Sequence, residues 1–291
     1  MGIKVGLQLF SIKEAMKENP LEAIRKAVEC GYCYIEVANH NALEDMGIGF
    51  GVKAEEVNKL LKDVGASIVS AHIYPFDKEK YKYILEYNAE IGNQNIIYPM
   101  GRFKDMDDVL NQCEMLNEYG EMAGKYGMKF YYHNHANEFM TVERKLIMDV
   151  IMDNTDADKV GFELDTFWAM RGGIDPVEYI RKYQNRIGLL HQKDMAKDTD
   201  SPINVFSRLT REVSEENMAA FRYCKQYVKP EDFTEIGRGI MDIQEIIDTA
   251  NEIGKTEYII LEQDYTGMEN EIESIRCSMQ EFKKFRGIEW E

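Results

Sequence analysis

The sequence lacks several features that would assign it to a familiar class of protein. It has no apolar run long enough to span a bilayer. Met1-Gly2-Ile3-Lys4 runs directly into an apolar strand and shows no signal-peptide pattern. There is no internal repeat, low-complexity tract or linker. We therefore expect a single domain over residues 1–291 that does not associate with membranes.

Cysteine is scarce, with five residues scattered along the chain. Cys30 and Cys33 have the C-x-x-C spacing of redox and zinc motifs, but no second pair follows them and Gly31 is placed to end a helix. We interpret the cysteines as structural thiols. This interpretation fits a reducing, cytoplasmic location.

Histidine and positive charge are also in short supply. The chain has five histidines and a formal net charge of −17, and an acidic surface repels the phosphate backbone of nucleic acids. No Gly-rich turn follows any apolar strand, so neither a dinucleotide-binding fold nor a phosphate cradle is indicated. We expect no nucleic-acid partner and no nicotinamide or flavin cofactor.

What the sequence does contain is a regular alternation of strands and helices. Eight short, nearly continuous apolar runs are typical of strands buried on both faces: Lys4–Phe10, Cys33–Val37, Ser67–Ile73, Asn95–Tyr98, Met128–His133, Val160–Asp165, Ile187–His191 and Tyr258–Glu262. Amphipathic patterns between them predict helices at Pro20–Cys30, Ala54–Val64, Glu79–Ile91, Met106–Lys125, Val142–Met152, Pro176–Tyr183, Ile243–Glu252 and Asn270–Phe285.

Eight repeats of strand and helix predict an α/β fold, a single (β/α)8 TIM barrel. A doubly wound open sheet is the alternative. The crossover after strand seven is unusually long and carries an inserted helical segment, Met195–Pro230, with a helix expected at Ser214–Tyr227. Inserts of this length over a barrel mouth are often lids, and an inert surface excursion is the other interpretation.

Polar side chains lie at, or just past, the ends of four successive predicted strands. These are Glu138, Asp165, His191 and Glu262. Because the carboxyl ends of parallel strands face one mouth of a barrel, we expect the four side chains to converge there. Three carboxylates and one imidazole can hold a hard or borderline divalent cation and leave room for a substrate. Glu163 precedes Asp165 by two residues and shares its face of the strand, but the terminal position favours Asp165.

Further polar and aromatic side chains are expected around this centre. His72 ends the third strand, and His133 and His135 end the fifth. Lys193 is expected to donate to a substrate oxygen, and Trp168 to form an apolar wall of the substrate site. We expect all five to contact substrate. Core packing for His72 and Trp168, and a solvated turn at Lys193, are the alternatives.

The motifs that carry these residues resemble the xylose-isomerase-like TIM-barrel superfamily, often labelled sugar phosphate isomerase/epimerase. The resemblance spans nearly the full length and rests on Gly6-Leu7-Gln8-Leu9-Phe10-Ser11, His133-Asn134-His135 with Glu138, Asp165-Thr166-Phe167-Trp168 with Gly173-Ile174-Asp175-Pro176, His191-Gln192-Lys193-Asp194, Gly237-Arg238-Gly239 and Glu262-Gln263-Asp264. It implies a Glu, Asp, His, Glu metal site that coincides with the four residues expected by position. It also implies a divalent metal, manganese first, with magnesium, cobalt or zinc as alternatives.

The resemblance implies a chemistry as well. In the related ketose 3-epimerases the two metal-bound glutamates also move the proton, which assigns that role to Glu138 and Glu262. The chain departs from those epimerases at Trp168, where they usually carry a histidine. Its Glu-Gln-Asp ending and histidine-rich strand five are similar to inosose dehydratases, whose three consecutive histidines are replaced here by His133-Asn134-His135.

The leading hypothesis is a metal-dependent isomerase or epimerase that removes a proton next to the carbonyl of a sugar, keto-sugar or cyclitol through a metal-stabilised enediolate. Loss of a β-hydroxyl or β-glycosyl group from that intermediate would instead give an inosose-dehydratase-like or keto-glycoside lyase reaction. One branch of the superfamily cuts DNA with three zinc ions, but five histidines and a charge of −17 argue against it. A non-catalytic sugar-binding or subunit barrel is the alternative of another class. The resemblance implies a homo-oligomer, or a hetero-oligomer for members that cleave glycosides.

Overall fold

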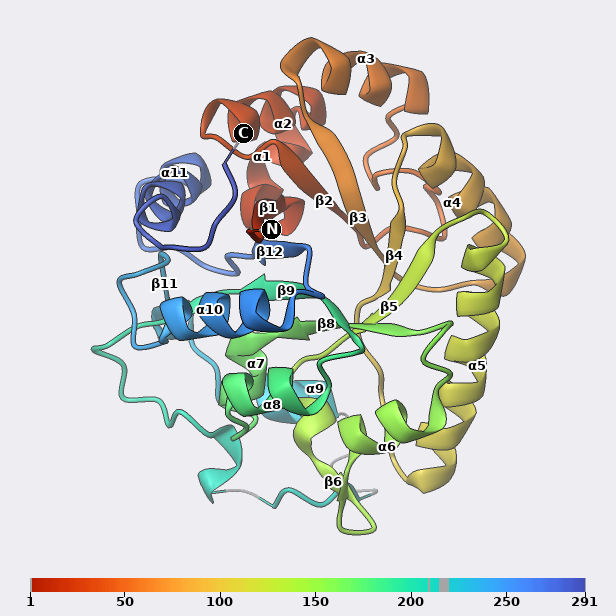
Figure 1. The fold of residues 1–291 in the computed structure, drawn as a ribbon, viewed down its shortest axis with the longest axis vertical. Coiled ribbons are helices and arrows are strands. Elements are labelled where there is room, and N and C mark those ends of the chain that lie inside the picture. The colour runs from red at the N-terminus through yellow and green to blue at the C-terminus, as the bar shows by residue number, and fades with distance from the viewer. Residues whose placement is uncertain (1, 209, 215–219, 291) are drawn as a thin grey trace.

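Eight parallel strands close into a barrel in the order β1-β12-β9-β8-β5-β4-β3-β2 (Figure 1). The structure is a computed structural model that describes residues 2–208, 210–214 and 220–290. The barrel strands are β1 (Lys4–Gln8), β2 (Tyr34–Asn39), β3 (Ser67–Ile73), β4 (Asn95–Tyr98), β5 (Lys129–His133), β8 (Gly161–Asp165), β9 (Ile187–Gln192) and β12 (Tyr258–Leu261). All eight predicted strands are present, and closure of the sheet confirms the (β/α)8 barrel over the open-sheet alternative.

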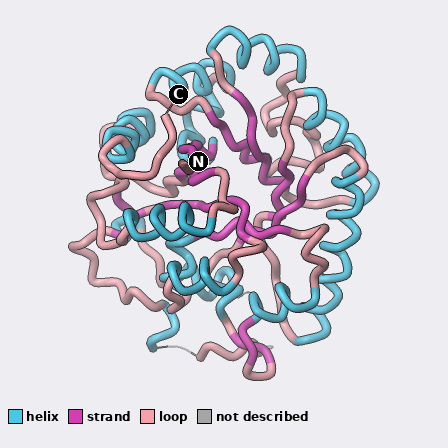
Figure 2. Tube along the Cα trace, viewed as in Figure 1, coloured by secondary structure: helices cyan, strands magenta, loops and turns pink. Residues whose placement is uncertain are grey.

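Helices surround the strands on the outside of the barrel (Figure 2). They are α1 (Lys13–Glu18), α2 (Pro20–Glu29), α3 (Ala54–Val64), α4 (Lys78–Glu90), α5 (Met106–Gly124), α6 (Ile147–Asn154), α7 (Thr166–Arg171), α8 (Pro176–Lys182), α9 (Ala220–Lys225), α10 (Ile243–Ile253) and α11 (Glu271–Phe282). Within the described residues, none of them combines the length and apolar character needed to cross a membrane.

The inside of the barrel is divided into an apolar layer and a polar layer. The apolar layer is a separate core cluster of Val69, Ile97, Tyr131, Leu189, Tyr258 and Ile260. Alternate residues of a strand share a face, so the residue two positions after an inward residue also points inward. These next inward residues are His133 after Tyr131, His191 after Leu189 and Glu262 after Ile260. The polar layer is therefore built from the same strands, directly on the carboxyl side of the apolar one.

One helix prediction needs correction, and two short helices, α1 and α7, were not predicted. The helix predicted at Val142–Met152 begins only at Ile147, because β6 (Thr141–Val142) and β7 (Lys145–Leu146) form a hairpin in its place. The hairpin turn residues adopt positive φ angles of 50° and 66°, as a tight two-residue turn requires. Helix α7 starts directly after β8, and the Asp165 carboxylate caps it by accepting the backbone N–H of Trp168.

The insert after strand seven is anchored at both ends. Its first residues, β10 (Asp194–Met195), pair antiparallel with β11 (Phe233–Thr234), which returns the chain towards α10. The helix predicted at Ser214–Tyr227 falls partly outside the described residues, and α9 lies within its remaining part. The interpretation of the insert as a lid stays a prediction.

Candidate metal centre

Four potential metal ligands meet at the carboxyl end of the neighbouring strands β5, β8, β9 and β12. They are His133, Asp165, His191 and Glu262, and one ligand atom from each lies within 4.8 Å of the others. All four are buried, and Glu262 is the most exposed at 8%. Three of the four residues predicted to bind metal are thus brought together, and strand five contributes His133.

A positive charge already lies between the two carboxylates of this group. The Lys193 ammonium is 2.6 Å from Oδ2 of Asp165 and also contacts Oε2 of Glu262. Burial alone would raise the pKa of Asp165, but Lys193 and His133 lower it to about 2. The Glu262 pKa is likewise held well below its usual value, against the effect of burial, chiefly by Lys193 and His191. The site therefore keeps two buried anions and stabilises a cation between them.

The donor set fits a divalent metal ion. Nε2 of His133 is buried, has no hydrogen-bond partner among the described residues, and lies 3.6 Å from Oδ2 of Asp165. Burial lowers the pKa of His133 to about 4, so its imidazole is neutral near pH 7, which is the form that ligates metals. Two imidazoles and two carboxylates suit borderline divalent cations such as manganese, cobalt and zinc.

A second polar layer lies directly beneath the ligands and contains Glu36, His72 and Glu163. Oε1 of Glu36 is 2.6 Å from Nε2 of His191. The other carboxylate oxygen of Glu36, Oε2, accepts a hydrogen bond from the Ser70 hydroxyl at 2.5 Å. Nε2 of His72 is 2.7 Å from Oε2 of Glu163. These three residues are 0–2% exposed, so Glu163 also points inward, one layer below Asp165.

This layer determines which nitrogen of His191 is available to a metal. With Nε2 hydrogen-bonded to Glu36, Nδ1 faces Glu262 Oε2 at 3.1 Å. A carboxylate on the far nitrogen of a ligand histidine fixes its tautomer and orientation. Sequence reasoning missed Glu36, although a carboxylate inside the apolar strand Tyr34–Asn39 was a usable signal, because its desolvation requires a partner.

A second group of potential ligands in the described residues consists of His72, His133, Glu163 and His191. Glu138, also predicted to bind metal, belongs to neither of the two groups. It lies in a 3-10 turn, Asn137–Phe139, beyond the end of β5, and is fully buried. Its carboxylate accepts hydrogen bonds from the Tyr132 hydroxyl at 2.6 Å and from the backbone N–H groups of His135 and Gly101 at 2.8 and 3.4 Å. The side chain therefore ties two mouth loops to β5.

The residues predicted to contact substrate lie at different depths. His135 faces the mouth, with its ring 5.0 Å from that of His133 and 5.5 Å from that of Trp168. The centre of the Trp168 ring in turn lies 6.0 Å from the Lys193 ammonium. His72 is deeper, because both of its ring nitrogens meet partners in the layer beneath the ligands. His135, Trp168 and Lys193 therefore surround the ligands, whereas His72 supports them from below.

Lys193 and Asp194 do not form the solvated turn considered as an alternative, since they are 1% and 0% exposed. Asp194 accepts backbone N–H groups from Gly237, Gly239 and Met241 at 2.9–3.1 Å. A Cβ at Gly239 would overlap the Asp194 carboxylate. The Gly-Arg-Gly segment therefore folds around Asp194 and fixes the loop beside the mouth.

Comparison with known proteins agrees with this architecture. Inosose dehydratase from Clostridium perfringens is 27% identical over 150 residues, a segment that covers 52% of this chain and 45% of that enzyme. The chain thus matches less than half the length of this relative. A sugar phosphate isomerase/epimerase from Parabacteroides distasonis superposes with a TM-score of 0.76 at 24% identity, covering 99% of this chain and 96% of that one.

An IolI protein with a bound zinc atom superposes with a TM-score of 0.70 at 16% identity, covering 96% of each chain. At such identities the two superpositions show the fold. The model of the xylose isomerase-like TIM barrel family matches residues 24–285. The chain belongs to this family.

Proposed function

We propose that this protein is a divalent-metal-dependent enzyme that removes a proton next to the carbonyl of a sugar, keto-sugar or cyclitol and returns it to give an isomer or epimer. The convergence of His133, Asp165, His191 and Glu262 within 4.8 Å at the barrel mouth carries this proposal. The names of the inosose dehydratase and the sugar phosphate isomerase/epimerase support a small carbohydrate or cyclitol as the substrate.

A divalent cation held by these four residues would supply Lewis acidity, which makes a C–H bond next to a carbonyl more acidic. Manganese is our first candidate, with magnesium, cobalt and zinc as alternatives. The zinc atom bound by the IolI protein supports a divalent metal as the cofactor.

Each neighbouring side chain has a defined task in the proposal. Glu262 takes the proton, because it is the most exposed carboxylate of the group and reaches the mouth. Lys193 donates a hydrogen bond to a substrate oxygen and stabilises the negative charge that develops there. His135 and Trp168 orient the sugar ring against one wall. His72 and Glu36 hold the ligand His191 from below.

We assign Glu138 a positioning role. Its carboxylate accepts three hydrogen bonds from Tyr132, His135 and Gly101, and it would have to give these up to approach the metal ligands. The hypothesis that Glu138 is a metal ligand and second base remains a prediction, and the Glu138→Gln variant described in the Discussion tests it.

A dehydratase or lyase outcome is the second candidate. It is favoured by the inosose dehydratase relative and by the presence of two donors, His135 and Lys193, on the mouth side of the ligands. Protonation of a departing hydroxyl or glycosyl oxygen by either group would turn proton abstraction into elimination.

The proposal is tested by elemental analysis and by exchange in deuterated water. Wild-type protein purified without chelator is expected to hold about one divalent ion per chain, and Glu262→Gln to hold much less. The loaded enzyme is then incubated with ketoses, inososes and 3-keto-glycosides in deuterated water. Deuterium next to the carbonyl without loss of water or of an alcohol indicates isomerase or epimerase activity, and loss of water or of an alcohol indicates the lyase. Absence of metal after reconstitution, or metal without exchange on any of these compounds, would favour a non-catalytic barrel.

A further inference from the structure

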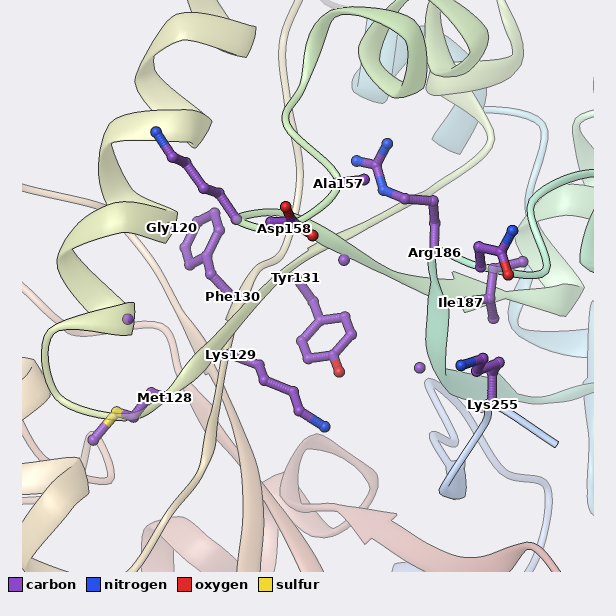
Figure 3. Close-up of a pocket in the computed structure, with 15 residues that line it drawn as sticks. Gly120, Met128, Lys129, Phe130, Tyr131, Ala157, Asp158, Arg186, Ile187 and Lys255 are labelled. Atoms are coloured by element: carbon purple, nitrogen blue, oxygen red, sulfur yellow. The ribbon is translucent and has the colours of Figure 1, made fainter.

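A cavity of about 370 Å³ opens at the end of the barrel opposite the metal centre (Figure 3). It is lined by the first residues of β5, β8 and β9, by the segments that precede β8 and β9, and by Lys255 ahead of β12. Lys129 and Gly161 lie four residues before His133 and Asp165, so the cavity is roughly 13 Å from the metal ligands along the strands. Its volume lies in the range of small-molecule sites.

The cavity collects positive charge in a chain whose net charge is −17. Four of its lining residues are Lys129, Lys159, Arg186 and Lys255. The Arg186 guanidinium already donates hydrogen bonds to backbone carbonyls and to a threonine hydroxyl. The Lys159 ammonium lies 3.2 Å from the Glu121 carboxylate. Lys129 and Lys255 are exposed and form no ion pair with any residue in the described part of the chain. Two ammonium groups are therefore available to a ligand.

The floor of the cavity offers a further donor, the hydroxyl of Tyr131. This residue is 6% exposed, and its hydroxyl makes no hydrogen bond to another described residue. A Cβ at Gly188 would lie 2.5 Å from the hydroxyl, so the glycine leaves the space that the phenol needs. Figure 3 shows the Tyr131 ring between Lys129 and Lys255. A nearly buried hydroxyl and two ammonium groups thus line one cavity, and none of the three is hydrogen-bonded to an acceptor among the described residues.

We propose that this cavity is a second binding site, separate from the metal centre, for the phosphate group of a small metabolite. The two cations without a partner in the described part of the chain are lysines, whose ammonium groups bind phosphate as point charges. The guanidinium of Arg186, whose forked geometry would suit a carboxylate, is already hydrogen-bonded to the protein. In Figure 3 the carboxylate of the lining residue Asp158 lies beyond the backbone end of the Tyr131 side chain, away from the hydroxyl. The phosphate group would contact the Tyr131 hydroxyl and the two lysines.

The site is tested with inorganic phosphate on the magnesium-loaded chain of 291 residues, by isothermal titration calorimetry at constant ionic strength. One saturable site is expected. Lys129→Gln and Lys255→Gln should each weaken binding about tenfold, because each removes one charge-assisted contact. Tyr131→Phe keeps the ring packing and should weaken binding about threefold.

Lys62→Gln is the matched control. It makes the same charge change at an exposed lysine on α3, outside the cavity, and should leave the dissociation constant unchanged. Three outcomes would overturn the proposal: no saturation below about 10 mM phosphate, saturation that the cavity variants do not weaken, or equal weakening by Lys62→Gln. The second would place phosphate elsewhere, and the third would indicate nonspecific attraction.

Discussion

Replacing Glu36 by glutamine tests whether the layer beneath the ligands controls metal affinity. Glu36 does not belong to the proposed ligand set, but its Oε1 lies 2.6 Å from Nε2 of His191. The substitution keeps the size of the side chain and removes its charge. Glutamine can still accept a hydrogen bond from Nε2, although its NH2 group no longer accepts from the Ser70 hydroxyl that holds the carboxylate at 2.5 Å.

The expected effect follows from the type of contact. A carboxylate behind a ligand histidine fixes the tautomer and makes the metal-bound nitrogen more basic, and its removal weakens metal binding about 10- to 100-fold. This corresponds to about 1.4–2.7 kcal/mol. Because glutamine preserves one neutral hydrogen bond, we expect Glu36→Gln to lie at the lower end, about tenfold.

The measurement is the metal dissociation constant, determined by competition with a chromophoric chelator. Glu163→Gln is the matched control, since it is the same substitution in the same layer, while its closest histidine contact is His72 at 2.7 Å and not His191, which lies 3.5 Å away. It should alter affinity less than threefold, because Glu163 is outside the proposed ligand set. An unchanged affinity in Glu36→Gln would refute the orienting role. An equal loss in Glu163→Gln would place the metal in the second group of potential ligands, which contains Glu163. Urea unfolding of both metal-free variants separates loss of affinity from loss of fold.

Three further variants test other parts of the site. Lys193→Met removes the ammonium that competes for the two ligand carboxylates, so metal should bind about tenfold more tightly while turnover falls; weaker binding would contradict this. Glu138→Gln should lower the free energy of unfolding by about 1–3 kcal/mol and leave metal content intact, whereas loss of metal at unchanged stability would restore Glu138 as a ligand. Arg171→Met removes the only ion-pair partner, 3.0 Å away, that the buried carboxylate of Asp232 has among the described residues, and leaves it the hydrogen bonds from Thr199 and the Lys229 backbone. The variant should cost about 3 kcal/mol in urea unfolding; a loss below about 1 kcal/mol would show that the ion pair contributes little.

The barrel was predictable because strands buried on both faces leave apolar runs in the sequence, as at Ser67–Ile73, where prediction and structure coincide. Helix starts were less predictable. The residues Val142–Leu146 fit a helical pattern, but positive φ angles at Glu143 and Arg144 turn them into a hairpin. Nothing in those two residue types demanded the left-handed conformation, so the hairpin was set by its surroundings.

The ligand set that we propose shares three residues with the set expected from the sequence, and it takes His133 in place of Glu138 for a geometric reason. Asp165 and His191 end buried strands, and Glu262 continues one, so the inward periodicity of the strand fixes their direction. Glu138 comes five residues after His133, the last residue of β5. Over that distance the chain forms a turn, and strand periodicity no longer determines where the side chain points. The inward residue at the strand end itself is His133, for which the sequence analysis had predicted a substrate contact.

The distribution of charge along the strands explains why composition alone was uninformative about binding. Acidic and imidazole side chains lie at the carboxyl ends of β5, β8, β9 and β12, while Lys129 is the first residue of β5 and Lys255 shortly precedes β12. A net charge of −17 averages these two ends and therefore does not reveal the lysines at the strand starts. Because the strands are parallel, all their starts face one side of the molecule and all their ends face the other. Lysines at the starts of different strands therefore contribute positive charge to the same side of the barrel. Counting charge separately for strand starts and strand ends thus distinguishes the proposed anion site from the proposed metal site.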